Sequence, residues 1–257
     1  MEELTLELIL LCIVAFAAGF VDAIVGGGGL IQLPAGLVLL PQHPVATVIG
    51  TLKLPAFCGT GIAAIQYSRK VRLSKKLLPV MMAIACVASF AGSFLLTQMS
   101  NSFMKPLLLV VLVVVAVYTY GNKKFGIHAE KILGSGREWL YAILVSFIIG
   151  FYDGFIGPGA GSFLIIAFIG LFGFDFLKAS AHAKFVNLAT NFGSIVLFVI
   201  TGKMIYAIAI PMAVFNAIGG WLGARLAILK GNRFIRVFFL IVVCVTIVRF
   251  AYDVFFR

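Results

Sequence analysis

Long apolar stretches, separated by short polar segments, run along the whole chain. They occupy roughly residues 4–24, 29–41, 44–67, 76–98, 102–121, 138–155, 160–173, 176–201, 204–229 and 233–255. Most of them approach the roughly 20 residues that an α-helix needs to cross the hydrocarbon core of a bilayer. The pattern therefore predicts an all-α integral membrane protein.

The chain also repeats itself at an offset of 131 residues, because Gly19-Phe20-Val21-Asp22 returns as Gly150-Phe151-Tyr152-Asp153. Other identical residues recur at the same offset: Gly26 and Gly157, Gly28 and Gly159, Leu33 and Leu164, Lys53 and Lys184, Gly92 and Gly223, Asn101 and Asn232, Phe103 and Phe234. Duplicated halves in an apolar chain are typical of secondary transporters, which bind their substrate between the halves. We predict a first repeat at 1–121, a linker at 122–137 and a second repeat at 138–257.

Basic residues fall in different loops of the two halves. The loop at 69–76 is strongly basic, whereas its counterpart around 201–207 carries only Lys203. The next loop reverses this bias, with only Lys105 in the first half and several basic residues in the second. Because cytoplasmic loops are enriched in Lys and Arg, equivalent loops are expected on opposite sides of the membrane. The repeats are therefore predicted to be inverted, with the basic linker in the cytoplasm.

Inverted repeats require an odd number of crossings in each half. Three full spans plus a re-entrant hairpin satisfy this, and so do five crossings, which gives about 8 to 10 membrane segments in all. Both arrangements place the two termini outside. We favour the hairpin, because the short second stretch of each half follows a glycine-rich junction, as the tip of a hairpin buried at mid-depth would.

Composition agrees with a membrane protein: 62% of the residues are hydrophobic, 11% are charged and the mean hydropathy is +1.14. The net charge of +11 lies mostly in loops between helices, where its expected partner is membrane lipid rather than nucleic acid. The acidic N-terminus lacks the basic region of a signal peptide. The four cysteines are scattered through apolar stretches, so we expect neither a metal site nor a redox role.

Glycine clusters precede the short stretch of each half, as Gly26-Gly27-Gly28-Gly29 and Gly157-Pro158-Gly159-Ala160-Gly161. Glycine costs a helix about 1 kcal/mol relative to alanine, so the clusters mark breaks. Backbone N–H groups freed within hydrocarbon need partners, and the positive end of the next helix favours an anion. We expect an anionic substrate to contact five of these residues: Gly27, Gly28, Gly29, Gly159 and Gly161. Close packing of helices is the alternative role.

Each half also places one lysine deep within an apolar stretch, at Lys53 and Lys184. A lysine at the bilayer centre costs about 2.5–3.5 kcal/mol on insertion scales, so it needs a partner, a pathway or a ligand. Two lysines that converge from opposite halves would form a positive centre. We predict that they bind the anionic substrate.

Three acidic or titratable residues are candidates for coupling: Asp22, Asp153 and His182. Each aspartate either exchanges a coupling proton or forms a structural ion pair with one of the lysines. The histidine is a candidate because its unperturbed pKa is about 6.5.

Polar side chains beside the lysines are candidate substrate ligands, namely Thr51, Asn187 and Asn191. The two asparagines share one helix face with Lys184. Hydrogen bonding between helices is the alternative role of all three. No catalytic motif accompanies them, and we expect neither an enzyme nor a cofactor.

These motifs resemble the TauE/SafE sulfite exporter family in both halves and over most of the chain. The first half contributes Gly19-Phe20-Val21-Asp22, the glycine cluster with Pro34, and Gly50-Thr51-Leu52-Lys53. The second contributes the segment from Gly150 to Gly159, then His182-Ala183-Lys184, Asn187 and Asn191. The resemblance implies transport, often export, of sulfite, thiosulfate, sulfoacetate or other small sulfur-containing or organic anions. It also implies that the glycine turns and both lysines line the pathway.

Two features depart from what the resemblance implies. The family is usually described with an even number of segments in each half, which would make the halves parallel, whereas the charge bias favours inversion. Leu52 stands where many relatives have Asn, which leaves the identity of the substrate open.

The sequence thus predicts a multi-pass, inner-membrane secondary transporter of small anions that works by alternating access, with a proton as candidate coupling ion. One alternative is a proton- or cation-centred carrier that uses Asp22 and Asp153. The other is a membrane scaffold without transport activity, or an intramembrane enzyme. The direction of transport and the oligomeric state are left open.

Overall fold

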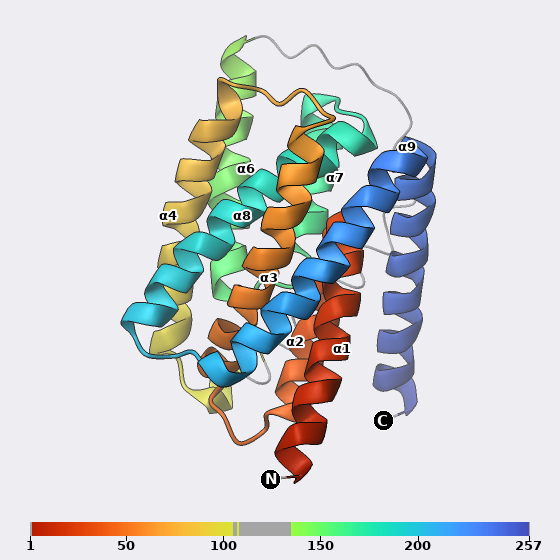
Figure 1. Ribbon diagram of the computed structural model, residues 1–257. Coiled ribbons are helices and arrows are strands. Elements are labelled where there is room, and N and C mark those ends of the chain that lie inside the picture. The colour runs from red at the N-terminus through yellow and green to blue at the C-terminus, as the bar shows by residue number, and fades with distance from the viewer. Residues whose placement is uncertain (1, 105–106, 108–134, 257) are drawn as a thin grey trace.

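A computed structural model describes residues 2–104, 107 and 135–256, and the regular structure within them is entirely helical. The helices are α1 (Glu2–Val25), α2 (Gly28–Leu39), α3 (Val45–Ser68), α4 (Leu77–Gln98), α6 (Ser135–Phe155), α7 (Ala160–Phe172), α8 (Phe176–Ile200) and α9 (Tyr206–Phe256) (Figure 1). The prediction of an all-α protein is therefore confirmed. The expected stretch at 102–121 and the linker lie almost wholly outside the described residues.

Six helices of the described part are long and apolar enough to cross a membrane. These candidate spans are Leu6–Val25, Val45–Ser68, Leu77–Gln98, Gly136–Phe155, Phe176–Ile200 and Tyr206–Ile235. The helices α2 and α7 have only 12 and 13 residues, too few to span about 30 Å of hydrocarbon at 1.5 Å per residue. Large apolar side chains such as Ile13, Val87 and Ile200 face outward and are more than half exposed, as lipid-facing residues would be.

Helix ends follow local chemistry. The chain reverses at Gly26, Gly157 and Gly159, whose φ angles of 75°, 96° and 81° are positive and favour glycine. An asparagine side chain distant in sequence caps the start of each long central helix: Asn101 Oδ1 accepts from Val45 N (3.0 Å), and Asn232 Oδ1 accepts from Leu177 N (2.7 Å). The helix α9 contains one non-helical residue, Gly231, with φ 68°, between the two stretches expected at 204–229 and 233–255.

The long helices form two groups, which we call the first bundle (α1, α3 and α9) and the second bundle (α4, α6 and α8). Small residues let the backbones approach within each bundle. In the first bundle, a Cβ atom on Gly220 would lie 2.6 Å from the carbonyl oxygen of Gly59. In the second, the hydroxyl of Ser89 donates to the carbonyl of Thr190 (2.7 Å). Each bundle thus combines two helices from one half of the sequence with one helix from the other half.

Contacts in one bundle recur in the other at the sequence offset of 131. Gly223 packs on the backbone of Phe20, and Gly92 packs on the backbone of Phe151. Figure 1 shows α1 and α6 running in opposite directions.

The helix α3 ends, and α4 and α8 begin, at the same end of the molecule (Figure 1). The exposed residues of the α3–α4 loop there are Arg69, Lys70, Arg72, Lys75 and Lys76. We call this the basic end; it is the end that the positive-inside rule assigns to the cytoplasm.

Candidate functional site

Two buried ion pairs connect the bundles, and they are equivalent at the offset of 131. Lys53 Nζ on α3 donates to the backbone oxygen (2.7 Å) and to Oδ1 (3.1 Å) of Asp153 on α6. Lys184 Nζ on α8 donates to the backbone oxygen and to Oδ2 (2.9 Å) of Asp22 on α1. In both pairs the lysine therefore satisfies a carbonyl at the end of a broken helix as well as a carboxylate. Each pair joins one half of the sequence to the other and one bundle to the other.

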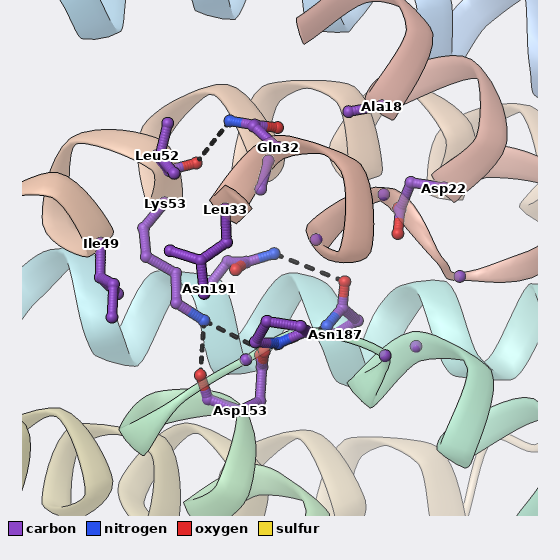
Figure 2. A pocket seen from close by; sticks show the side chains of 18 of the residues that line it. Ala18, Asp22, Gln32, Leu33, Ile49, Leu52, Lys53, Asp153, Asn187 and Asn191 are labelled. Carbon is purple, nitrogen blue, oxygen red and sulfur yellow. Dashed lines mark hydrogen bonds and ion pairs between the residues drawn. The ribbon is translucent and has the colours of Figure 1, made fainter. Parts of the chain in front are cut away.

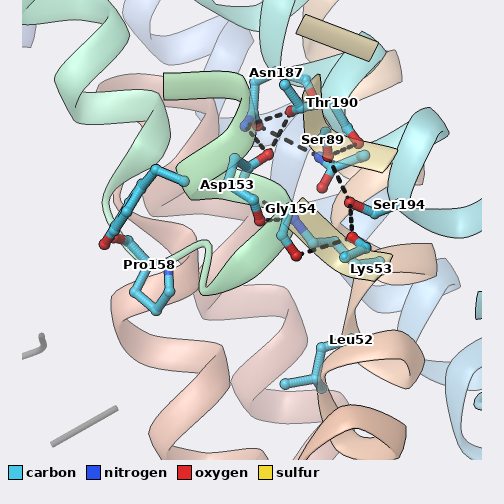
Figure 3. A network of polar contacts seen from close by, with 12 residues as sticks. Leu52, Lys53, Ser89, Asp153, Gly154, Pro158, Asn187, Thr190 and Ser194 are labelled. Atoms are coloured by element: carbon cyan, nitrogen blue, oxygen red, sulfur yellow. Dashed lines mark hydrogen bonds and ion pairs between the residues drawn. The ribbon is translucent and has the colours of Figure 1, made fainter. Parts of the chain in front are cut away.

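Asp153 is only 3% exposed, and both of its carboxylate oxygens have partners (Figure 3). Lys53 occupies Oδ1, while Thr190 Oγ1 and Asn187 Nδ2 (3.3 Å) donate to Oδ2. Asp22 has fewer partners: besides Lys184, it accepts from Thr60 Oγ1 (3.2 Å), and its side chain is 18% exposed. The two aspartates are thus equivalent in sequence but differ in access.

A chain of buried hydroxyl groups lies behind Asp153 and joins α4, α6 and α8 (Figure 3). Ser93 Oγ donates to the carbonyl of Gly154 (2.9 Å) and contacts Ser194 Oγ (2.9 Å), which also contacts Ser89 Oγ (2.7 Å). These bonds end on carbonyl groups and fix the second bundle, so their role is structural.

The two glycine turns touch each other at the centre of the molecule. A Cβ atom on Gly26 would lie 2.3 Å from the carbonyl carbon of Gly161. Ser162 donates its N–H to the carbonyl of Gly26 (3.2 Å) and its hydroxyl to the carbonyl of Val25 (2.8 Å). The positive start of α7 therefore covers the negative end of α1, an arrangement of helix dipoles that is favourable.

A cavity of about 600 Å³, including the space at its mouth, lies between α1, α2 and α3 and the second glycine turn (Figure 2). Its charged and amide-bearing lining residues are Asp22, Gln32, Lys53, Asp153, Asn187, Asn191 and Asn216. Its lining glycines are Gly26, Gly28, Gly29, Gly157, Gly159 and Gly161. On α3 the lining comes from Ile49 to Ala56, in the half of that helix away from the basic end. Figure 2 shows the side chains of Lys53 and Asp153 directed toward each other beside the cavity.

Nine of the thirteen residues predicted from the sequence line this cavity. They are Asp22, Gly28, Gly29, Lys53, Asp153, Gly159, Gly161, Asn187 and Asn191. The others, Gly27, Thr51, His182 and Lys184, do not belong to its lining. Lys184 is fully buried behind Asp22, and Gly27 precedes the first residue of α2.

Thr51 and His182 hold equivalent structural positions away from the cavity. Thr51 Oγ1 donates to the carbonyl of Thr47 (2.7 Å) and accepts from the N–H of Ile205 (3.0 Å). His182 likewise bonds the carbonyl of Lys178 through Nδ1 (2.8 Å) and accepts from the N–H of Ser74 at Nε2 (3.1 Å). Both ring nitrogens are used by the neutral tautomer, so a proton on Nε2 would face the Ser74 N–H instead of an acceptor.

Two lining residues, Gln32 and Asn216, were missed by the sequence analysis. Asn216 Nδ2 donates to Gln32 Oε1 (3.0 Å), and Gln32 Nε2 donates to the carbonyl of Leu52 (3.2 Å). Each is a lone polar residue in an apolar helix, which is a usable signal. Their counterparts at the offset of 131 are Phe163 and Ala85, so a search for residues present in both halves passes over them.

The lining combines one ammonium group and four side-chain amides, which can donate hydrogen bonds, with the two carboxylates of Asp22 and Asp153. Within the described ranges, no group of three or more His, Cys, Asp or Glu side chains could hold a metal ion.

Comparison with known proteins identifies the family. Residues 11–250 match the sulfite exporter TauE/SafE family. The probable membrane transporter protein YfcA of Escherichia coli K12 is 35% identical over 240 residues, covering 93% of this chain and 88% of the relative. A probable membrane transporter protein of Haemophilus influenzae is 34% identical over 245 residues, covering 95% and 94%. A third, ORF9 of a Sinorhizobium species, is 32% identical over 254 residues, covering 98% and 96%.

No solved structure matches the chain significantly. The family match extends over nearly all of the chain and includes both ion pairs and both glycine turns. With the apolar helices that surround them, it shows a multi-pass transporter of the inner membrane, and the chain belongs to the TauE/SafE family of membrane transporters.

Proposed function

We propose that the protein carries small anions, such as sulfite, thiosulfate or organosulfonates, across the inner membrane by alternating access, in the direction of export. The observation that carries this proposal is Lys53, an ammonium group that lines a central cavity and is only 6% exposed. Because a buried ammonium group requires a negative partner, an anion that enters the cavity can take the place of Asp153. Gln32, Asn187, Asn191 and Asn216 then supply amide donors to its oxygen atoms.

The glycine turns suit the same substrate. Gly28 and Gly29 form the first turn of α2, whose positive dipole end lies at the cavity. A Cβ atom on Gly28 would lie 2.6 Å from the Cβ atom of Asp22, so glycine also allows α2 to pack closely on α1. The proposal therefore includes both roles considered for these glycines, substrate contact and close packing.

The two halves are proposed to be inverted repeats that enclose this site. Support comes from the ion pairs and helix caps that recur at the offset of 131 and from the opposite directions of α1 and α6. The hairpins α1–α2 and α6–α7 would enter from opposite faces, with their glycine turns meeting at mid-depth. Asp22, the more exposed aspartate, is the proposed site of a coupling proton.

The alternative of a cation-centred carrier has weaker support. Both aspartates already have a lysine partner within hydrogen-bond distance, so a cation entering the cavity would meet a neutralised carboxylate and a positive ammonium group. An anion meets Lys53 with a displaceable partner.

Thermal stabilisation of the purified protein by anions tests the proposal. A ligand that binds only the folded state stabilises it by about 2.7 kcal/mol at 100 times its dissociation constant. We expect one or more of sulfite, thiosulfate, sulfate and sulfoacetate to raise the melting temperature, and lactate and taurine to raise it less. The same anion should leave the melting temperature of the Lys53→Ala variant unchanged. If sodium or a change of pH shifts the melting temperature and no anion does, the alternative of a cation- or proton-centred carrier that uses Asp22 and Asp153 is favoured instead.

A second test addresses the amide donors. Replacing Gln32 by leucine leaves Asn216 without its acceptor and removes one donor from the cavity. Losing a hydrogen bond to a charged group costs about 1.5–3 kcal/mol, so we expect Gln32→Leu to weaken anion affinity by about 10- to 150-fold in a titration. Gln66→Leu is the matched control, because Gln66 bonds the carbonyl of Trp221 away from the cavity. Equal affinity in both variants would remove Gln32 from the site.

A further inference from the structure

The cavity breaks the equivalence of the two halves. It is lined by Leu33, Ile49, Leu52 and Lys53 of the first half. Their counterparts at the offset of 131, Leu164, Ser180, Ala183 and Lys184, are at most 1% exposed and line no part of it. The lining residues of α3 lie in the half of that helix away from the basic end, whereas the three counterparts on α8 lie in the half nearest the basic end. The molecule is therefore closed on the side where an equivalent cavity would lie.

Two hydroxyl groups have no hydrogen-bond partner among the described residues: Ser180 Oγ on α8, which is on the closed side, and Ser146 Oγ on α6. Both side chains are fully buried. Burying a hydroxyl without a partner costs about 1–3 kcal/mol by mutational data. Such groups are stabilised by a state in which water or a polar ligand reaches them. Ser180 occupies the position of Ile49, a residue that lines the cavity in the other half.

The ion pairs mark the boundary along which such an opening takes place. Lys53–Asp153 connects the bundles beside the existing cavity, and Lys184–Asp22 connects them at the equivalent position. Besides its lysine, Asp22 accepts from Thr60, and Asp153 accepts from Thr190 and Asn187; these additional contacts lie within one bundle and do not cross the boundary.

We infer that the protein contains a second, closed half-site for the same anion, centred on Lys184 and lined by Leu164, Ser180 and Ala183, which opens toward the basic end when the Lys184–Asp22 pair separates. The inference rests on the proposed anion transport and assigns the conformational state: this structure has the non-cytoplasmic side accessible and the cytoplasmic side shut. In the opposite state the roles of the two pairs are exchanged. Lys184 then faces the anion, and Lys53–Asp153 closes the other side.

Cysteine accessibility tests the inference. The four native cysteines are first replaced by alanine, and single cysteines are introduced as Ser180→Cys and, as the matched counterpart, Ile49→Cys. Right-side-out and inside-out vesicles are treated with a membrane-impermeant cationic thiol reagent. We expect Ile49→Cys to react from the non-cytoplasmic face only. Ser180→Cys should be unreactive from both faces, and should react at least tenfold faster from the cytoplasmic face once Asp22→Asn is added.

The double variant Asp22→Asn/Lys184→Gln covers the case in which Asp22→Asn alone fails to fold, since it removes both charges together and leaves no unpaired lysine. Protection of the introduced cysteine from the thiol reagent by a bound anion is measured with sulfate and sulfoacetate, because these anions, unlike sulfite and thiosulfate, do not attack the reagent. Ser180→Cys that reacts from the non-cytoplasmic face, or stays unreactive in both opened variants, overturns the inference. Thermal shifts on the same proteins separate the two proposals. If anions bind but Ser180→Cys never becomes reactive, only the half-site is refuted. If Ser180→Cys becomes reactive but no anion binds, only the proposed substrate is refuted.

Discussion

Replacing Lys53 by alanine is expected to lower saturable anion flux in proteoliposomes at least about 30-fold while the protein still inserts into the membrane. The ammonium group is the positive charge of the cavity lining, and its removal also leaves the carboxylate of Asp153 without its charged partner. Truncating one partner of a buried charge pair costs about 2–5 kcal/mol, which corresponds to roughly 30-fold or more in an equilibrium constant.

Two control variants separate loss of the substrate site from loss of the fold. In Lys53→Ala/Asp153→Asn both charges are absent, so the unpaired carboxylate no longer destabilises the protein; we expect its melting temperature to recover and its flux to remain lost. Lys203→Ala removes the same charge from a loop, where Nζ donates to the carbonyl of Thr97 (2.9 Å), and should retain flux. Flux that returns in the double variant would show that Lys53 serves only to neutralise Asp153.

The second large effect is expected for Gly26→Ala, which should reduce the yield of folded protein and lower its melting temperature more than any other single alanine in the first glycine turn. The new Cβ atom would lie 2.3 Å from the carbonyl carbon of Gly161 and 2.6 Å from the nitrogen of Ser162, and both are backbone atoms that cannot rotate away. Overpacking of this kind costs about 1–3 kcal/mol, and the φ angle of 75° adds about 1–2 kcal/mol.

Gly202→Ala isolates the second of these contributions. Gly202 has a similar φ angle of 66°, but a Cβ atom there would meet nothing within 4 Å. Size-exclusion profiles and melting curves of the two detergent-purified variants give the comparison. If both variants lose the same stability, the contact between the turns contributes nothing and only the backbone conformation matters.

Much of the fold was predictable, because helix ends in this chain coincide with abrupt changes in composition. The expected stretch at 76–98 corresponds to Leu77–Gln98, and that at 160–173 corresponds to Ala160–Phe172. In both cases glycine or a polar cluster follows directly on an apolar run. The bundles were not predictable, since nothing in an apolar helix specifies which neighbour its small residues will contact.

The site was predictable in outline but not in its pairing. The sequence offered a proton-exchange role and an ion-pair role for Asp22 and Asp153, and the structure pairs each with the lysine of the opposite half. Thr51 and His182 lie outside the cavity lining for a different reason. Each lies two residues before a central lysine, and residues two apart in a helix do not face the same side, so geometry alone directs them away from the cavity.

The exchange of one helix between the bundles has a consequence for how the protein is made. The helices α1 and α3 are synthesised early, whereas α9, the helix on which Gly19 and Gly59 pack, is synthesised after the other described helices. Until α9 is synthesised, these glycines lack the helix that packs on them. In the same way, α4 lacks its partners until α6 and α8 are synthesised. Neither bundle can be completed from one half of the chain. A translation product truncated after the first half therefore lacks at least one helix of each bundle, and the first bundle is complete only when α9 has been synthesised.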